Sequence, residues 1–492
     1  MITAHTGLNL ADWGFLWYGE WLTRVGEIPL RDFQSYDPGR YYFLAAVSFV
    51  FGEGVVGTRE ALALVQWIGI TAALCLLRRA GGSWTVTSAC GFVLVWWMVP
   101  EHKMFEASLS LLAVSVAFYM AAHATPRAYF LAGTYVGVAA LFGRNHGLYA
   151  LLAFICILIF LRFKENRLVS MERIASFTAG IVAGYSPLWI ACIIVPGFFH
   201  AMVESVRVIF AHGTNLPLPI PWPWRVHYSG LSVLSALFGL TVGLCFILAY
   251  FETATAILFL LASRWKPDDR RLLLLACAFV GAFYLHHASV RATIQHFSQA
   301  TPPLVLLAFV VFLKAPRYVK SSTLALGLMI ATFSVLRAQP VVQRALEGNW
   351  VQRAIEGDRI WISPSDATVL DSVVRFDKTY NPQAAPILLT PIIPTLYRIL
   401  RRRSPTWEIY FLIPASPAAD AAAVRSLRSS GAPFAIVGDI PIDQRDTLRF
   451  RNIYPELYAY IQRTYRKVND FTLAPPYQAY EKVRSTAATQ QP

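Results

Sequence analysis

The strongest constraint on the fold is a series of apolar segments that approach or exceed the length of a bilayer crossing. A spanning helix needs about 20 mostly apolar residues. Stretches of this kind lie at approximately 61–77, 84–99, 107–123, 128–142, 147–161, 174–198, 230–263, 272–288, 302–314 and 320–337. The longest, 230–263, is expected to form one tilted helix with an interfacial extension. The sequence therefore predicts an α-helical polytopic membrane protein with about 10–11 transmembrane helices.

Composition supports this class. Hydrophobic residues make up 56% of the chain and charged residues 15%, whereas soluble proteins contain about a quarter charged residues. A soluble α/β enzyme, a disordered tail and a collagen-like fibre are thereby excluded. All six cysteines lie inside apolar runs without CxxC spacing, so we expect neither disulfides nor a cysteine metal site.

Lys and Arg divide the loops into two sets. One set of alternate loops carries 14 basic residues and the other carries 5. Cytoplasmic loops are the basic ones, so residues 1–60 and the tail after 338 are expected outside the membrane. Most of the net charge of +14 then comes from the cytoplasmic loops and reflects the orientation of the chain in the membrane. Nucleic acid is therefore not an expected partner.

The N-terminal segment raises a question of topology. The stretch Tyr41–Phe51 is too short to span, and counting it as a crossing would invert every loop. We expect it to lie at the outer interface, with its tyrosines at headgroup level. Because the chain would then begin outside, we expect a first transmembrane helix upstream of Met1.

The tail alternates short apolar runs with helical patterns, which predicts a small parallel α/β domain. Strands are expected at 386–389, 408–412 and 434–437, and helices at about 366–379, 392–403, 418–430 and 453–467. Ser365 is expected to cap the first of these helices, and Arg401–Arg403 to end the second. The tail has no histidine and no phosphate-binding glycine motif, so it reads as an accessory domain. The predicted domains are 1–60, 61–338 and 339–492.

Polar chemistry is concentrated on the outer side of this topology, where nine of the ten histidines fall. The first loop is the most informative stretch. Asp12 precedes an aromatic-rich segment, followed by a Gly26–Pro29 turn, then Arg31-Asp32-Phe33 and Asp37-Pro38-Gly39 before a Tyr-rich helix.

This loop resembles that of the GT-C fold membrane glycosyltransferases, in particular the protein O-mannosyltransferase, lipid A aminoarabinose transferase and lipopolysaccharide-core galacturonosyltransferase group. The resemblance covers residues 11–60 and the general span pattern to about 340. Family members often carry an acidic pair at the first position, whereas Trp13 follows Asp12 here. The resemblance implies a polyprenyl-phosphate sugar donor and transfer to the hydroxyl of a lipid, polysaccharide or protein acceptor at the outer face of a bacterial-type inner membrane.

The candidate catalytic residues are acidic. Asp12 suits a general base, although it could instead cap the following helix. Asp32 could equally form a structural ion pair with Arg31. Glu101 is placed by the resemblance at the outer end of a span. With His102 it could ligate a divalent metal, but neighbouring helical residues point apart, so the metal site is unknown.

Fixed cations are needed for the phosphate of the leaving group. The candidates are Lys103, Arg144, Arg225 and Arg291, of which Lys103 and Arg291 could instead snorkel to lipid headgroups. The predicted activity is an inverting hexosyl- or pentosyltransfer. The alternatives are a transporter or flippase for a lipid-linked or small polar substrate, and a membrane receptor whose tail binds a ligand.

Overall fold

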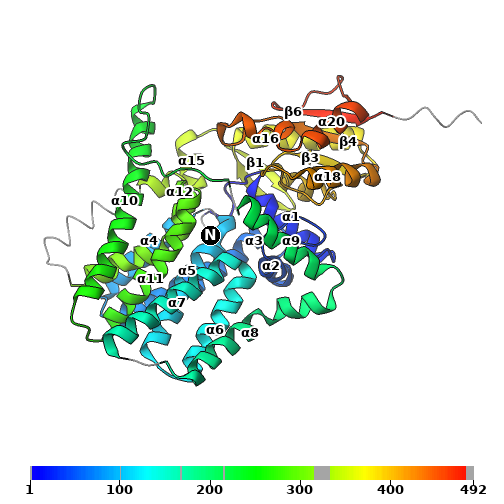
Figure 1. Ribbon diagram of the computed structural model, residues 1–492. Helices are drawn as coiled ribbons and strands as arrows, with labels where there is room; N and C mark the ends of the chain where they lie inside the picture. The colour runs from blue at the N-terminus through cyan, green and yellow to red at the C-terminus, as the bar shows by residue number, and fades with distance from the viewer. Residues whose placement is uncertain (1–2, 100, 167–168, 214–215, 315–332, 484–492) are drawn as a thin grey trace, which may run out of the picture. The chain divides into compact units, whose positions relative to one another are not determined.

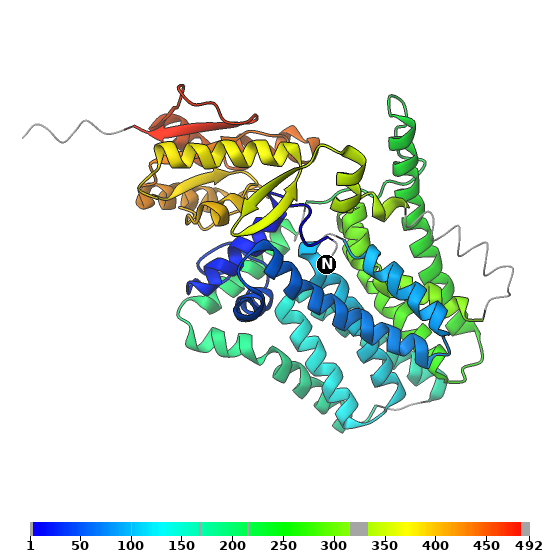
Figure 2. The ribbon, with the colours of Figure 1, turned by 180° about the vertical axis from the view of Figure 1, so that it is seen from behind.

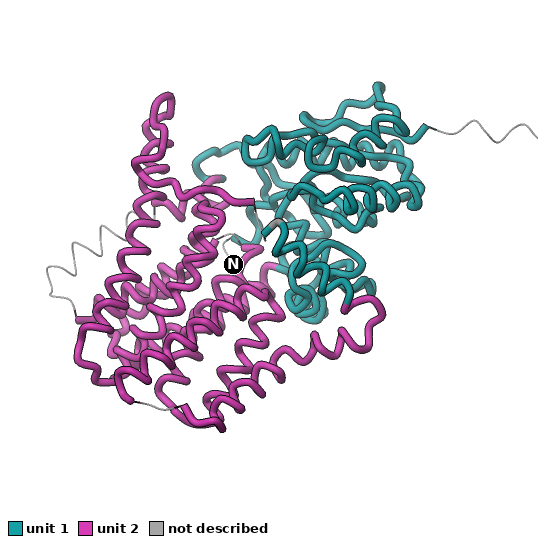
Figure 3. The backbone as a smooth tube through the Cα atoms, in the orientation of Figure 1, with its two compact units in different colours: residues 1–58, 200–214, 344–492 teal, residues 59–199, 215–343 magenta. Residues whose placement is uncertain are grey.

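The computed structural model describes residues 3–99, 101–166, 169–213, 216–314 and 333–483. The chain divides into two compact units, coloured in Figure 3. Unit 1 comprises residues 1–58, 200–214 and 344–492, and unit 2 comprises residues 59–199 and 215–343. The N-terminal loop and the C-terminal tail thus belong to one unit, although the helices of unit 2 separate them in sequence.

Unit 2 is a bundle of apolar helices (Figure 1). Its elements are α3 (Val55–Arg79, which begins in unit 1), α4 (Trp84–Trp97), η1 (Glu101–Lys103), α5 (Met104–Ala122), α6 (Pro126–Phe142), α7 (Arg144–Glu165), α8 (Met171–Ile194), α10 (Val233–Ala262), α11 (Asp269–Val290), α12 (Ile294–Ala300) and α13 (Pro302–Phe312). Among the described residues, six helices are long and apolar enough to cross a membrane. These six are α3, α7, α8, α10, α11 and the continuous segment formed by η1 and α5. The pair α12–α13, bent by 61°, adds a seventh if it counts as one span.

The predicted membrane segments from 61–77 to 302–314 all coincide with helices. Segment 230–263 is one continuous helix, α10. Helices α4 and α6 are shorter than the six long spans, and most of the predicted segment 320–337 lies outside the described residues. The chain is an integral membrane protein of helical type, as predicted.

Helices α6 and α8 approach each other through glycines. Gly133 and Gly137 on α6 face Gly180 and Gly184 on α8, four residues apart on each helix. A Cβ on Gly180 would lie 2.2 Å from the carbonyl oxygen of Phe130, and the other three positions are similarly closed by backbone. Such pairs of small residues allow membrane helices to pack backbone to backbone.

Gly180→Ala is therefore expected to destabilise the protein by about 1–3 kcal/mol, the usual cost of overpacking. The measurement is the Tm of the purified full chain in detergent. Gly239→Ala on α10 is the matched control, because its Cβ would have its nearest neighbour at 3.7 Å, and alanine favours a helix over glycine. Equal Tm values for the two variants would contradict the close crossing.

Unit 1 combines N-terminal helices with an α/β region. Its elements are α1 (Asp12–Arg24), α2 (Pro38–Phe51), α9 (Phe198–His212), α15 (Pro340–Glu347, which begins in unit 2), β1 (Val351–Ile355), β2 (Asp358–Ile362), α16 (Pro364–Tyr380), β3 (Ile387–Thr390), α17 (Thr395–Leu400), α18 (Pro417–Ser430), β4 (Phe434–Gly438), η2 (Ile442–Gln444), η3 (Asp446–Leu448), α19 (Phe450–Ile453), α20 (Pro455–Thr464), β5 (Tyr465–Lys467) and β6 (Tyr477–Lys482). Helices α16, α18 and α20 lie around the main sheet (Figures 1 and 2).

The main sheet has the strand order β3-β4-β6-β5. Strands β3 and β4 are parallel, with Ile387 opposite Phe434, and the chain between them includes the crossover helix α18. Strand β6 pairs antiparallel with both β4 and β5, and residues 468–476 connect β5 to β6. The sheet is therefore mixed, and the prediction of a parallel domain holds only for its β3–β4 half.

Two further local predictions are wrong. Residues 408–412 form no strand: the backbone N–H groups of Ile409 and Tyr410 donate to the side-chain oxygen of Gln34 at 3.2 and 3.0 Å. The N-cap of α16 is Ser363, whose Oγ accepts from the N–H of Asp366 at 3.1 Å. Ser365 is inside the helix because Pro364 occupies the first helical position, where proline is favoured.

Candidate active site

The candidate residues fall into both units: Asp12 and Asp32 belong to unit 1, and the other five belong to unit 2. Each set has its own local geometry.

Asp12 is the first residue of α1, a helix that has no side-chain N-cap. Instead, the side-chain oxygen of Asn9 accepts from the N–H groups of Ala11 and Asp12 at 2.6 and 3.1 Å. The alternative that Asp12 caps the helix therefore has no support in the structure. Its Oδ1 accepts a hydrogen bond from the Tyr410 hydroxyl at 2.9 Å, and the side chain stays half-buried. Asp12 lies in the first turn of α1, at the positive end of the helix dipole.

Aromatic side chains pack beside Asp12. The ring of Phe15 lies 5.5 Å from that of Tyr410 and 4.5 Å from that of Tyr36, centroid to centroid. Tyr41 donates its hydroxyl to the carbonyl of Phe15 at 3.0 Å and accepts from the N–H of Tyr36 at 3.0 Å. The aromatic residues of the first loop thus fix the N-terminal turn of α1, which carries the carboxylate.

Asp32 forms the predicted ion pair with its neighbour. Arg31 donates Nε to Oδ1 at 2.7 Å and Nη2 to Oδ2 at 2.8 Å, and the N–H of Ile28 donates to Oδ2 at 2.8 Å. Partial burial opposes ionisation, but the bonds from Arg31 and Ile28 outweigh it and lower the pKa of Asp32. These contacts brace the turn after Gly26, where φ is +95°, and fit a structural role better than proton transfer.

A third acid of the first loop, Glu20, was not among the candidates. It is 3% exposed and accepts a hydrogen bond from the Thr58 hydroxyl at 3.0 Å. Burial raises the pKa of Glu20 to about 7.

The shift of Glu20 predicts a pH dependence of stability. Its neutral form is favoured in the folded state, so the stability it contributes is present below pH of about 4.5 and is lost as pH rises through about 7. Glu20→Gln keeps an acceptor for Thr58 and should increase the free energy of unfolding at pH 8 by up to about 3 kcal/mol relative to the wild type. The measurement is the Tm of the two proteins, which should be higher for the variant at this pH. At pH 4.5 the two proteins should be equally stable. A variant that is less stable than the wild type at pH 8 would show that the ionised carboxylate of Glu20 stabilises the folded state, which would contradict this prediction.

In unit 2, Glu101 is engaged by a buried cation. Its Oε2 lies 2.8 Å from Nε of Arg59, whose side chain is 4% exposed. Lys103 lies 3.7 Å from Glu106, whose side chain is 5% exposed. Both acids are therefore partnered by basic side chains at the ends of α3 and η1.

A metal is a poor fit to these groups. Within the described residues, no three His, Cys, Asp or Glu side chains lie close enough together to hold an ion. Glu101, one of the two candidate ligands, is paired with Arg59. No step is therefore assigned to a divalent metal.

Histidines gather near the predicted cations, a cluster that the site prediction did not include. His146 contacts the Tyr284 hydroxyl at 3.1 Å, and His287 contacts Gln299 at 3.2 Å. The rings of His146 and His287 are 6.2 Å apart, and those of His287 and His296 are 5.8 Å apart. The signal was present in the sequence, because the histidines concentrate on one side of the predicted topology.

The cluster brings two predicted cations together. Lys103 and Arg291 both lie within electrostatic reach of His296, as do His287 and Glu106. Arg291 donates Nη1 to the carbonyl of Leu216 at 3.0 Å. We call His146, His287, His296, Lys103 and Arg291 the cation–histidine cluster.

The two remaining cations sit differently. Arg144 is the first residue of α7, two positions before His146, and is half-buried. Arg225 lies on the loop before α10 and is exposed. Its N–H donates to the carbonyl of Trp222, whose ring stacks on that of Trp224 at 5.5 Å.

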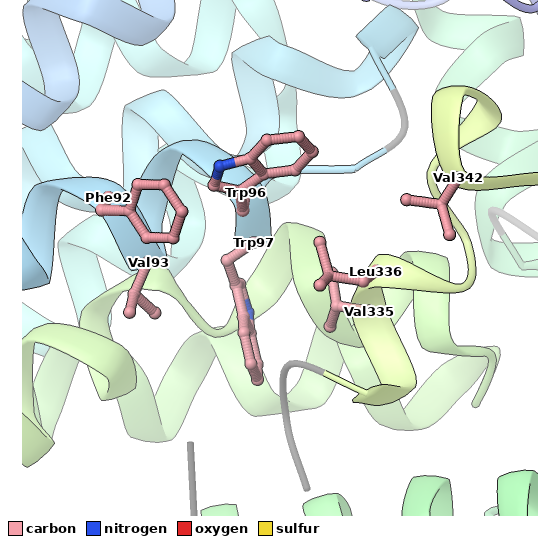
Figure 4. Close-up of a pocket in the computed structure, with 7 residues that line it drawn as sticks. All are labelled: Phe92, Val93, Trp96, Trp97, Val335, Leu336 and Val342. Atoms are coloured by element: carbon pink, nitrogen blue, oxygen red, sulfur yellow. The ribbon is translucent and has the colours of Figure 1, made fainter. Parts of the chain in front are cut away.

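An apolar hollow of about 210 Å³ lies beside the C-terminal end of α4 (Figure 4). It is lined by Phe92, Val93, Trp96, Trp97, Val335, Leu336 and Val342. Trp97 is anchored by a hydrogen bond from its Nε1 to the Thr301 hydroxyl at 2.9 Å. The lining offers almost no polar atom, so only an apolar ligand suits it.

Comparison with known proteins identifies the fold. No protein-family model and no curated protein sequence matches the chain. Among solved structures, the chain is similar to ArnT from Cupriavidus metallidurans bound to undecaprenyl phosphate, with a TM-score of 0.57 and 13% identity over 99% of this chain and 96% of that chain. The apo form of the same protein gives 0.46 and 14% identity over 98% and 95%.

A further match is the archaeal oligosaccharyltransferase AglB from Archaeoglobus fulgidus in complex with an inhibitory peptide and a dolichol-phosphate. It gives a TM-score of 0.46 and 12% identity over 97% of this chain and 71% of that chain. Together with the apolar helix bundle and the small C-terminal sheet, the whole-length similarity to ArnT shows that this chain is a polytopic membrane protein of the GT-C fold class.

Proposed function

We propose that the chain is an inverting glycosyltransferase that moves a sugar from a polyprenyl-phosphate donor to an acceptor hydroxyl. The observation that carries the proposal is the whole-length similarity to ArnT, which was solved with undecaprenyl phosphate. Because a fold hosts more than one function, the side chains must supply the chemistry. The same proposal places the reaction at the outer face of a bacterial-type inner membrane.

Asp12 is assigned as the general base. Its carboxylate is half-buried, is positioned by Tyr410 and occupies the first turn of α1. A general base removes the proton from the attacking hydroxyl as the new glycosidic bond forms at the anomeric carbon. The bond from that carbon to the phosphate oxygen breaks in the same displacement, which inverts the anomeric centre. Asp32 and Glu101 remain proposed site residues, with positioning roles that fit their ion pairs.

The cation–histidine cluster is assigned to the leaving phosphate. Lys103, Arg291 and nearby Arg144 supply positive charge, which stabilises the phosphate as the bond to the sugar breaks. Arg225, on its exposed loop, is assigned to the same phosphate at the rim. The apolar hollow beside α4 suits part of the isoprenoid chain.

The experiment uses the purified full chain in liposomes with radiolabelled polyprenyl-phosphate sugars and envelope extracts as the acceptor source. The expected result is transfer of label from one donor class, with an inverted anomeric configuration by NMR. Donor that is never consumed in the presence of any acceptor fraction would overturn the proposal.

A transporter is the second candidate, because the bent pair α12–α13 is a discontinuous helix of the kind that transporters use. The same liposomes distinguish the two functions. A transporter would move an intact lipid-linked sugar between leaflets without breaking the bond between sugar and phosphate.

A further inference from the structure

A second pocket of unit 2 is not part of the site assigned above. Its volume is about 400 Å³, within the range of about 300–1,000 Å³ for ligand sites. Its apolar lining includes Pro221, Phe238 and Val242. The lining also includes the polar side chains of Thr293, Gln295, Arg337 and Gln343. We call it the Arg337 pocket.

Arg337 is held in place in this pocket. Its guanidinium carbon lies 5.3 Å from the centroid of the Phe238 ring, a cation–π contact. The side-chain nitrogen of Gln343 donates to its carbonyl at 3.3 Å. Its Nη1 is buried, and within the described part of the chain this atom has no hydrogen-bond partner.

A buried charged donor without an acceptor is costly, so such a group is expected to meet one in the functional state. The planar fork of an arginine matches the paired oxygens of phosphate. Thr293, Gln295 and Gln343 can hydrogen-bond to neighbouring hydroxyls of the same ligand, while the Phe238 ring suits its apolar part. The pocket therefore combines one cation, several neutral polar groups and apolar side chains.

We propose that the Arg337 pocket binds a phosphate group of the glycosyl acceptor. The pocket begins at Ala292, directly after Arg291, which the proposed function assigns to the donor phosphate. Naming the ligand as the acceptor rests on that proposed function, whereas the binding of phosphate by Arg337 does not. The acceptor class so defined is a phosphate-bearing molecule, either an amphiphile or a soluble compound.

The test measures the Tm of the full chain in detergent at increasing concentrations of inorganic phosphate or lysophosphatidic acid. A ligand that binds the folded state raises Tm with its concentration. We expect Arg337→Gln to weaken binding of the effective probe at least tenfold. Arg127→Gln, at an exposed position on α6 outside the pocket, is the matched control and should bind as the wild type does.

The two probes distinguish the sources of phosphate. A response to both indicates a soluble phosphate compound, and a response to lysophosphatidic acid alone indicates an amphiphile; either supports the pocket. No response of the wild type, or equal binding by Arg337→Gln, overturns it.

A second variant covers the case in which Arg337→Gln does not fold. Gln295 is exposed on the rim, so Gln295→Glu should fold normally and place a carboxylate opposite the bound phosphate. It should lose phosphate binding at least tenfold, and retained binding would contradict the proposal.

Undecaprenyl phosphate as a third probe separates this inference from the proposed function. Arg337→Gln should bind it as the wild type does, because the donor phosphate is assigned to other cations. A parallel loss of undecaprenyl phosphate binding would overturn the acceptor assignment. A chain that transfers no sugar but binds phosphate through Arg337 would refute the proposed function and leave the anion pocket standing.

Discussion

Asp12→Asn is expected to lower the rate of sugar transfer about 10²–10⁴-fold, the usual contribution of a general base. Asparagine has nearly the shape of aspartate and can still accept the hydrogen bond from Tyr410, so the N-terminal turn of α1 should keep its geometry. It cannot take the proton of the attacking hydroxyl. The measurement is transfer from the labelled donor at saturating concentration, with Tm measured alongside.

Two variants control for indirect effects on Asp12. Glu27→Gln removes an acid of the same loop that pairs with exposed Arg403 at 2.8 Å, and it should change the rate by less than about threefold, in line with the small energy of a surface ion pair. Tyr410→Phe removes the hydrogen bond but keeps the ring packed on Phe15, and its loss should be much smaller than that of Asp12→Asn. A rate for Asp12→Asn within threefold of the wild type, with transfer otherwise intact, would remove Asp12 as the base.

The helices of unit 2 could be predicted because each membrane span is a continuous run of apolar residues in the sequence. A run such as 147–161 is apolar on all sides, and α7 contains it with a few polar residues added at each end. The pairing of α6 with α8 was also recoverable, since Gly133 and Gly137 repeat the spacing of Gly180 and Gly184. The bend between α12 and α13 was not predicted, because α12 (IQHFSQA) carries too many polar residues to count as a span and only α13 falls in the predicted segment 302–314.

The tail was harder because its strands depend on distant partners. The hairpin β1–β2 was missed. Its turn residues Glu356 and Gly357 both have positive φ, as a two-residue hairpin turn of type I′ requires, but Glu-Gly is not one of the dipeptides that mark such a turn in a sequence. Segment 408–412 has a strand-like composition, but its backbone donors are used by Gln34 of the first loop. No local pattern could show that the first loop and the tail form one unit.

The candidate site shows the same difference between features encoded locally in the sequence and features that depend on distant contacts. Single residues such as Asp12 could be named as candidates because a resemblance in the first loop marks them. The cation–histidine cluster was missed as a unit because its members come from α7, α11, α12 and η1, and only packing brings them together. Arg398 was missed for a related reason: as a charged residue in a predicted helix, it looks like an ordinary surface residue.

Arg398 is instead among the most buried charges of the protein. Its side chain is 2% exposed, its Nη1 lies 3.0 Å from Glu356, and its Nη2 lies 3.7 Å from Glu53. Its guanidinium carbon lies 5.0 Å from the Trp17 ring and 5.9 Å from the Trp21 ring. Arg398 thereby joins α17 to α1, the helix that carries Asp12, and to the turn of the β1–β2 hairpin. The backbone of α17 also contacts Gly14 of α1 so closely that a Cβ there would lie 1.9 Å from the nitrogen of Thr395.

Arg398→Met is expected to destabilise the protein by about 3–5 kcal/mol, because it removes one partner of a buried ion pair and two cation–π contacts. The measurement is the Tm of the full chain in detergent. Arg401→Met is the matched control: Arg401 contacts the same Glu356 oxygen at 2.9 Å, but its side chain is 69% exposed, so its loss should cost no more than about 1 kcal/mol. In the background of Glu356→Gln the cost of Arg398→Met should shrink, whereas equal Tm values for Arg398→Met and Arg401→Met would show that burial does not strengthen the pair. Since Arg398 holds α1, sugar transfer by Arg398→Met should also fail at a lower temperature than transfer by Arg401→Met.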